Sequence, residues 1–517
     1  MGDKRGHLGN SVRSITIATA ISMAGFLYGL DTGIIASTIA HSTFKRAMYG
    51  AAMKNAAIQG GIVSAYYGGS AVGSAASGWT MDACSRRWSL LIGSAVSVVG
   101  AVVQAAAAGP AMMIAGRALS GFSTGMVYPV APVYLSEISP PENRAFLVGL
   151  KGLMNTLGFF AAGWIGYAGS FATGDLQWRI PLATQAPPAL LLAIMTFFLP
   201  YSPRWLMQKQ QYEDAKKTMH YLHEHRGEDF IEQEYARMYE QIAIEANRKK
   251  AARWGVLFTR RYIRRTLLGC LIVNMTKLSG SNIIQNYQTL MYDALGYKGQ
   301  QVLLIQALYG FMALVAQAVS VFTISDHWPR RPTVIGGEVC LVAILCILTG
   351  LSAAFPDDRN PDGSRAGVAF IYLFAFAYSF FFNSVVWVLV AEIFPLDLRG
   401  VGVGFSVFSQ AITAIWLSFA ASIAFQEIAW RFYFVFIACN VFAGLCYFFF
   451  LPETNQLGLE EIAARFGDVV AAPLEKNVET PPSPVQRNIS AAEQSANPDK
   501  TESTAHIERA ADGKSNV

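Results

Sequence analysis

Long apolar stretches follow one another along the chain at intervals that suit a membrane protein. A hydrocarbon core about 30 Å thick needs about 20 mostly apolar residues per helix, because each helical residue rises about 1.5 Å. By this measure the first part of the chain has candidate spans at 14–37, 57–79, 88–107, 110–134, 145–168 and 183–200. The second part has candidate spans at 265–291, 302–325, 333–354, 366–390, 400–424 and 431–451. The pattern predicts an all-α membrane protein with about twelve transmembrane helices in two six-helix bundles.

Polar segments divide the chain into five regions. Residues 201–264 are rich in Lys, Arg, Glu and Gln, and after Pro452 the composition shifts to Ser, Pro, Ala, Glu, Asn and Lys, which is typical of a disordered tail. We therefore expect an N-terminal segment at 1–13, one bundle at 14–200, a linker with short helices at 201–264, a second bundle at 265–451 and a largely disordered tail at 452–517.

The composition agrees with an integral membrane protein and argues against an enzyme. Of the 517 residues 53% are hydrophobic and 15% are charged, and the mean hydropathy is +0.33. The sequence shows no nucleophile paired with a base, no phosphate-cradling loop and no metal-ligand cluster, and its six cysteines lack the spacing of a metal site or a disulfide framework. We expect no enzymatic activity, no cofactor, no metal and no nucleic-acid partner.

Basic residues gather in alternate loops, which sets the expected orientation. These residues are Lys4, Arg5, Arg13, Arg86, Arg87, Arg144, Arg330 and Arg331. Loops expected on the other side of the membrane, such as 108–110 and 425–430, have almost no Lys or Arg. We expect a multi-pass membrane protein with both termini in the cytoplasm and no cleavable signal peptide, and this pattern favours the plasma membrane.

Two charged motifs occur at corresponding places in both parts of the chain. GWTMDACSRR at 78–87 corresponds to SDHWPRR at 325–331, and YLSEISPPENRA at 134–145 corresponds to VAEIFPLDLRG at 390–400. A repeat of whole six-helix parts is typical of alternating-access transporters, whose substrate site lies between the parts.

Carboxylates and arginines in these motifs can pair and hold helix ends together until the two parts move. The candidate gating residues are Asp82, Arg86, Arg87, Glu137 and Arg144 in the first part and Asp326, Arg330, Arg331, Glu392 and Arg399 in the second. The alternative is that they only set topology and solubility.

Taken together, the motifs resemble the sugar porter family of the major facilitator superfamily, over nearly the whole chain from Gly25 to Glu461. The motifs that carry the resemblance are YGLDTG at 28–33, GRALSGFSTG at 116–125, YSPRWL at 201–206, LSGSN at 278–282, VVWVLVAEIFPLDLRG at 385–400 and LPET at 451–454. The resemblance implies a sugar transporter that works by alternating access in a lipid bilayer.

Asp31 lies deep in the first apolar stretch, and Arg117 in the fourth is its expected neighbour. A buried carboxyl group can take up and release a proton when its surroundings change. Proton-coupled sugar porters carry an Asp and an Arg at these two positions, so the resemblance implies proton symport. The alternative is a static buried ion pair.

The resemblance also implies a set of substrate-binding residues. Asn282 and Trp387 match the family's helix 7 asparagine and helix 10 tryptophan, Gln410 falls on a polar position of helix 11, and Tyr28 stands where an aromatic residue is frequent. Amides bind sugar hydroxyls and an indole stacks on the apolar face of a sugar ring, although Trp387 would also serve as simple packing.

Several positions depart from the family pattern. Thr276 and Lys277 replace a Gln-Gln pair, Gly152 replaces a Gln, Asn286 replaces a Tyr, and 383–384 reads Asn-Ser in place of Gly-Pro. A lysine near the centre of a span costs about 2.5 to 3.5 kcal/mol, and pairing with a substrate carboxylate would offset that cost. With Gly152 expected to leave space opposite Lys277, we predict an acidic sugar such as galacturonate.

Other interpretations remain open at this point. Lys277 could extend its stem to a water-filled vestibule or pair with Glu338 or Asp31, and Lys151 could face another helix or the cytoplasmic edge. A neutral hexose, pentose or disaccharide carrier is the alternative function, and a non-transporting sugar sensor is a third. The predicted partners are the sugar or sugar acid, protons and lipid, and we expect a functional monomer.

Overall fold

The computed structural model describes residues 12–50, 55–139, 144–246, 253–323, 328–354, 361–395 and 398–455, with Ile462 and Phe466. The chain divides into a unit at Met1–Val470 and a unit at Ala471–Val517. The second unit, with most of the tail predicted to be disordered, lies outside the described residues. Within the described residues every regular element is a helix.

The first half of the chain, residues 12–200, forms nine helices. They are α1 Val12–Ala40, α2 Ser42–Tyr49, α3 Ala56–Ala83, α4 Arg86–Ala105, α5 Pro110–Val127, α6 Val130–Ile138, α7 Arg144–Gly169, α8 Leu176–Ala183 and α9 Ala186–Thr196. The linker forms α10 Pro203–Gln208, α11 Tyr212–His223, α12 Glu228–Ala246 and α13 Arg253–Val256.

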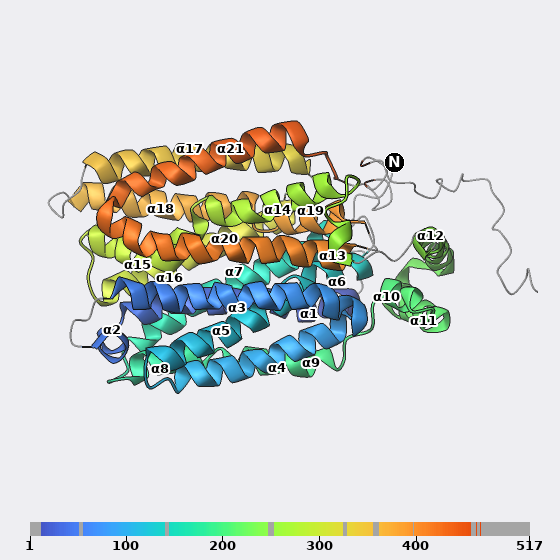
Figure 1. The fold of residues 1–517 in the computed structure, drawn as a ribbon, viewed down its shortest axis with the longest axis horizontal. Helices are drawn as coiled ribbons and strands as arrows, with labels where there is room; N and C mark the ends of the chain where they lie inside the picture. The colour runs from blue at the N-terminus through green and yellow to red at the C-terminus, as the bar shows by residue number, and fades with distance from the viewer. Residues whose placement is uncertain are drawn as a thin grey trace, which may run out of the picture. The chain divides into compact units, whose positions relative to one another are not determined.

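The described residues of the second half, within 263–451, form eight α-helices and the short 3-10 helix η4 Ala429–Phe432. The α-helices are α14 Ile263–Leu278, α15 Ser281–Ala294, α16 Gln300–Thr323, α17 Arg330–Ala354, α18 Pro361–Phe381, α19 Val385–Ile393, α20 Arg399–Glu427 and α21 Tyr433–Phe450. The long helices run alongside one another, and the blue and cyan helices of the first half are grouped beside the yellow and orange helices of the second (Figure 1). The two halves meet mainly where α3 packs on α20 and α7 packs on α16.

Nine helical stretches among the described residues are long and apolar enough to cross a bilayer. They are Arg13–Ala40, Arg86–Ala105, Phe146–Gly169, Ile263–Thr289, Gln300–Thr323, Arg330–Ala354, Asp362–Ile393, Arg399–Ala421 and Trp430–Phe450. The other predicted spans, 57–79, 110–134 and 183–200, fall on α3, on α5 with α6, and on α9. Their signal is weaker because α3 is rich in Gly, Ala and Ser, α5 ends shortly before Pro129, and α9 has only 11 residues.

Small residues bring some helices into backbone contact. A Cβ atom added at Gly69 of α3 would lie 2.0 Å from the main-chain oxygen of Ala118, and one at Gly121 of α5 would lie 1.9 Å from that of Tyr66. Close approach of this kind is how helices associate in lipid, where apolar side chains gain nothing by leaving the solvent. Large apolar side chains instead cover the outer surfaces, as at Phe198, which is 81% exposed.

Several of the described helical rods are interrupted. The break between α14 and α15 lies at Ser279 and Gly280, the break between α18 and α19 lies at 382–384, and Tyr128 and Pro129 separate α5 from α6. Gly280 has a φ of +98°, which favours glycine because it has no side chain. Interrupted helices free backbone and side-chain polar groups inside a membrane protein, where they can line a cavity.

The linker helices form their own small core and bind the end of the bundle. Their buried apolar residues are Leu206, Met207, Ala215, Met219, Ile231 and Met238. The indole nitrogen of Trp205 donates to the main-chain oxygen of Asp82 over 3.3 Å, and Arg13 forms an ion pair with Glu224 over 3.1 Å. The linker is therefore attached to the first half at the start of α1 and the end of α3.

Candidate functional site

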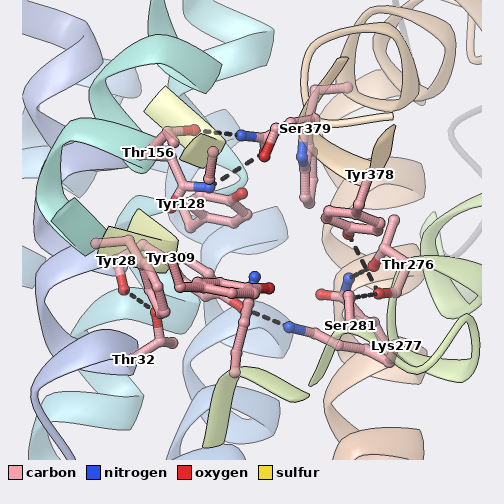
Figure 2. Close-up of a pocket in the computed structure, with 17 residues that line it drawn as sticks. Tyr28, Thr32, Tyr128, Thr156, Thr276, Lys277, Ser281, Tyr309, Tyr378 and Ser379 are labelled. Carbon is pink, nitrogen blue, oxygen red and sulfur yellow. Dashed lines mark hydrogen bonds between the residues drawn. The ribbon is translucent and has the colours of Figure 1, made fainter. Parts of the chain in front are cut away.

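A pocket of about 630 Å³ lies between the two halves, where the interrupted helices come together. Its lining from the first half is Tyr28, Thr32, Tyr128, Asn155, Thr156 and Phe159, and from the second half Thr276, Lys277, Ser281, Gln285, Tyr309, Ala313, Tyr378, Ser379, Asn383, Trp387 and Gln410. Figure 2 shows Tyr28, Thr32 and Thr156 on one side and Thr276, Lys277 and Tyr378 facing them. Both halves therefore contribute to one polar and aromatic cavity.

Lys277 is the one charged residue among those that line this pocket in the described chain. Its Nζ donates a hydrogen bond to the hydroxyl of Tyr28 over 2.7 Å, across the boundary between the halves (Figure 2). The structure gives no ion pair for Lys277 within the described residues, so neither Glu338 nor Asp31 is its partner there. A buried ammonium group whose hydrogen-bond partner among the described residues is a neutral phenol has capacity left to bind an anion.

Five of the predicted substrate-binding residues line the pocket, namely Tyr28, Thr276, Lys277, Trp387 and Gln410. The amide nitrogen of Gln410 donates to the hydroxyl of Thr276 over 2.6 Å and to the main-chain oxygen of Val273 over 3.1 Å. These bonds fix the direction of the amide. Tyr128 holds Trp387 edge-on, with 4.6 Å between the ring centroids.

Asn282 and Asn286 are buried, but they do not line the pocket. The Oδ1 of Asn282 accepts a hydrogen bond from the hydroxyl of Tyr67 over 2.6 Å, and its Nδ2 donates to Ser418 over 3.0 Å. Asn286 donates to the same Tyr67 hydroxyl over 3.0 Å. Because Tyr67 belongs to α3 and both asparagines belong to α15, this polar network joins the halves instead of facing the cavity.

Gly152 also lies outside the pocket lining, and the space expected there is filled. A Cβ atom at Gly152 would lie 2.9 Å from the hydroxyl of Ser384 and 3.1 Å from the main-chain oxygen of Asn383. Asn383 donates to the hydroxyl of Thr156 over 2.6 Å and accepts from Asn155 over 3.2 Å. The departures at 152, 383 and 384 therefore fit one another, because the missing side chain makes room for the interrupted α18–α19 segment.

Asp31 and Arg117 are both buried, but their side-chain groups are not joined as a hydrogen-bonded ion pair. The guanidinium of Arg117 donates to the main-chain oxygen of Asp31 over 3.1 Å and lies 4.5 Å from the ring centroid of Tyr66. Neither carboxyl oxygen of Asp31 has a hydrogen-bond partner among the described residues. Burying a carboxylate without donors is costly, so this environment suits the neutral acid.

Among the candidate gating residues of the described chain, Arg86 and Arg330 each form a close ion pair, and each pair lies within one half. Arg86 bonds Glu137 over 2.7 Å in the first half, and Arg330 bonds Glu392 over 2.7 Å in the second. Asp82 lies 3.9 Å from Arg86. The matched geometry in the two halves reflects the repeated sequence motifs.

The remaining predicted gating residues bind backbone groups or lie beyond the description. Arg87 donates to the main-chain oxygen of Phe197 over 2.7 Å, Arg331 donates to that of Phe448, and Arg399 approaches that of Phe394 at 3.5 Å. Asp326 lies outside the described residues, and Arg144 is described only as the first residue of α7.

Several contributing residues were not singled out from the sequence. Glu453 accepts hydrogen bonds from the backbone N–H groups of Arg330 and Arg331 and so caps α17. Glu453 belongs to the LPET motif, which is the feature of the sequence that could have indicated this role. Ser202 of the YSPRWL motif donates to Glu137 over 2.5 Å. Tyr128 lines the pocket, and no pattern in the sequence marks it.

Comparison with known proteins gives a consistent result. The family described as "Sugar (and other) transporter" matches residues 17–466. The MFS-type transporter criB of Aspergillus cristatus is 33% identical over 86% of this chain and 92% of its own, and the galactose-proton symporter of Escherichia coli is 28% identical over 88% and 94%. A solved structure of the proton:xylose symporter XylE, of the major facilitator superfamily, superposes with a TM-score of 0.76 at 21% identity, covering 88% of this chain and 99% of that one.

Proposed function

Since the chain belongs to the sugar transporter family of the major facilitator superfamily, we propose that it carries a small hydroxylated solute across a membrane together with a proton, by alternating access. The family membership agrees with the predicted all-α fold of this superfamily and with a transporter instead of an enzyme. The observation that carries the proposal is the pocket between the halves, to which both contribute polar and aromatic side chains.

Asp31 is the proposed proton carrier. Its carboxyl group is fully buried and has no hydrogen-bond partner among the described residues, while Arg117 lies at its main-chain oxygen. A small shift of α1 against α5 would bring the guanidinium to the carboxylate and release the proton. The similarity to a galactose-proton symporter and to a proton:xylose symporter supports proton coupling.

For the substrate we propose an acidic sugar such as galacturonate. This choice rests on Lys277, whose ammonium group lines the pocket and has a neutral phenol as its partner. A substrate carboxylate would supply the missing counter-charge.

A neutral sugar is the second candidate, and the relatives favour it, because they are symporters of galactose and xylose. Hydroxyl, amide and aromatic groups make up the rest of the lining, which suits an uncharged sugar equally well. In this case Lys277 would donate to a sugar hydroxyl.

The buried ion pairs of Arg86 and Arg330 each lie within one half, so we propose that they brace the helix ends of that half while the halves move as bodies, in place of latches that open during the movement. We also propose that the chain acts as a monomer in the plasma membrane with both termini in the cytoplasm. The basic loops support this orientation.

The test is uptake by the full chain in a host without sugar carriers of its own, using labelled galacturonate, glucose, xylose and lactose. An uncoupler and Asp31→Asn should both abolish accumulation. Lys277→Gln should impair galacturonate uptake more than glucose uptake, with the exposed Lys298→Gln as the matched control. Glucose uptake that galacturonate does not compete with would overturn the acidic substrate, and uptake insensitive to the uncoupler would overturn proton coupling.

A further inference from the structure

A second lysine is buried behind the aromatic wall of the pocket. Lys151 of α7 has an exposed fraction of 0%, and its Nζ lies 3.2 Å from the ring centroid of Tyr128 and 3.6 Å from that of Trp387. Its Nζ has no hydrogen-bond partner in the described part of the chain. The two rings therefore stand where an acceptor or a counter-ion would normally be, since aromatic faces attract a cation.

The two rings belong to different halves. Tyr128 lies at the break between α5 and α6 in the first half, and Trp387 lies on α19 in the second. Both line the pocket, whereas Lys151 does not. Tyr128 also stacks on Tyr28, with 4.1 Å between centroids and 20° between planes. The ammonium group of Lys151 thus contacts one pocket-lining ring from each half and does not itself line the pocket.

We propose that Lys151 is a positioning residue, whose charge holds Tyr128 and Trp387 at the angle that shapes the pocket and joins the halves while the pocket is closed. It acts through the rings and not by contact with the solute. The inference rests on the proposed function only in taking this pocket as the place where the solute binds.

Charge and bulk can be separated at this position. Methionine matches the length and apolar volume of the lysine stem but has no charge, so simple packing would tolerate Lys151→Met. Arginine keeps a cation that binds aromatic faces. A contribution from the charge therefore predicts that Lys151→Arg retains function that Lys151→Met loses.

The experiment uses the purified full chain in proteoliposomes, with labelled glucose and labelled galacturonate as the probes. We expect Lys151→Met to raise KM roughly tenfold for whichever probe is carried, as for a desolvated cation–π contact, and Lys151→Arg to stay within about threefold. In the Lys151→Met background, Trp387→Leu should cause a smaller loss than it does in the wild-type chain, because the two residues act together. Wild-type KM in Lys151→Met, or equal losses in Met and Arg variants, would overturn the proposal.

A second measurement does not depend on transport. Subtracting the fluorescence of Trp387→Phe isolates the emission of Trp387, which we expect to change in Lys151→Met and to be largely restored in Lys151→Arg. Unchanged emission would overturn the inference even if uptake were absent, whereas absent uptake with the expected emission change would count against the proposed function alone. If Lys151→Met fails to fold, Trp387→Phe, which keeps a ring, should retain more activity than Trp387→Leu; equal activity would overturn the proposal.

Discussion

The ammonium group of Lys277 donates a hydrogen bond to the hydroxyl of Tyr28 over 2.7 Å, and this bond connects α14 of the second half to α1 of the first. The Tyr28 ring is at the same time stacked on Tyr128. The charged group of the pocket is therefore held by a neutral partner that an anion can replace without leaving another charge unpaired.

Replacing Tyr28 by Phe should change the selectivity of the pocket. The variant keeps the ring that stacks on Tyr128 but removes the hydroxyl group. Lys277 then has no hydrogen bond to break before it binds a carboxylate. Hydrogen bonds to charged groups contribute about 1.5 to 3 kcal/mol, so binding of galacturonate should tighten by roughly tenfold while binding of glucose should not. Competition assays on purified protein would measure both, and equal weakening for the two sugars would contradict an anion-binding role for Lys277.

Arg86 and Glu137 should be strongly coupled. Their side chains are 2% and 1% exposed and 2.7 Å apart, so removing either partner breaks a buried ion pair, at a cost of about 3 to 5 kcal/mol. Asp82, 3.9 Å from Arg86, and the hydroxyl of Ser202 on Glu137 would offset part of that cost. Arg86→Met and Glu137→Gln should each lower the thermal unfolding temperature in detergent, and the double variant should lose less than their sum. Asp214→Asn is the control, because its pair with Lys217 is well exposed and contributes little. Additive losses would indicate that the two residues act separately.

Asn282→Ala and Tyr67→Phe should have effects of the same kind. The two side chains share one hydrogen bond in a network that lies outside the pocket lining, so either change should slow transport of every sugar. The double variant should lose less than the sum of the single losses, because the shared bond is lost only once. Uptake rates across several sugars would show this. A change of sugar preference in Asn282→Ala alone would place this amide in contact with the solute.

Gly280→Ala should destabilise the break between α14 and α15. A φ of +98° strains any residue with a side chain by about 1 to 3 kcal/mol, and the new Cβ would lie 3.2 Å from the ring of Phe436. Gly336→Ala is the matched control, because a Cβ there meets nothing within 4 Å on helix α17. Unfolding temperatures of the two variants would be compared, and equal values would show that the positive φ is not needed.

Much of the fold could be read from the spacing of apolar residues, because each span needs a minimum length in lipid. Spans with many small residues were harder to delimit, as α3 and α9 show. Lys277 and Trp387, which their register in the family motifs predicts to bind the substrate, both line the pocket.

Side-chain direction beyond a helix break could not be predicted. Asn282 follows Gly280, whose positive φ interrupts the helical period that would otherwise relate it to Lys277. The filling of the space at Gly152 depends on Ser384 from another helix. One sequence also does not show that Lys151 faces two aromatic rings, because those rings come from distant segments.

The cap on α17 has a practical consequence for where the protein can be shortened. Glu453 binds the backbone at the start of α17, and further along the guanidinium of Arg265 lies 4.6 Å from the ring centroid of Phe466. Deletion from residue 467 onward would leave both attachments in place, whereas deletion from residue 452 would remove both. A reporter protein fused after Phe466 would therefore stay close to the start of α17 and to Arg265 of α14.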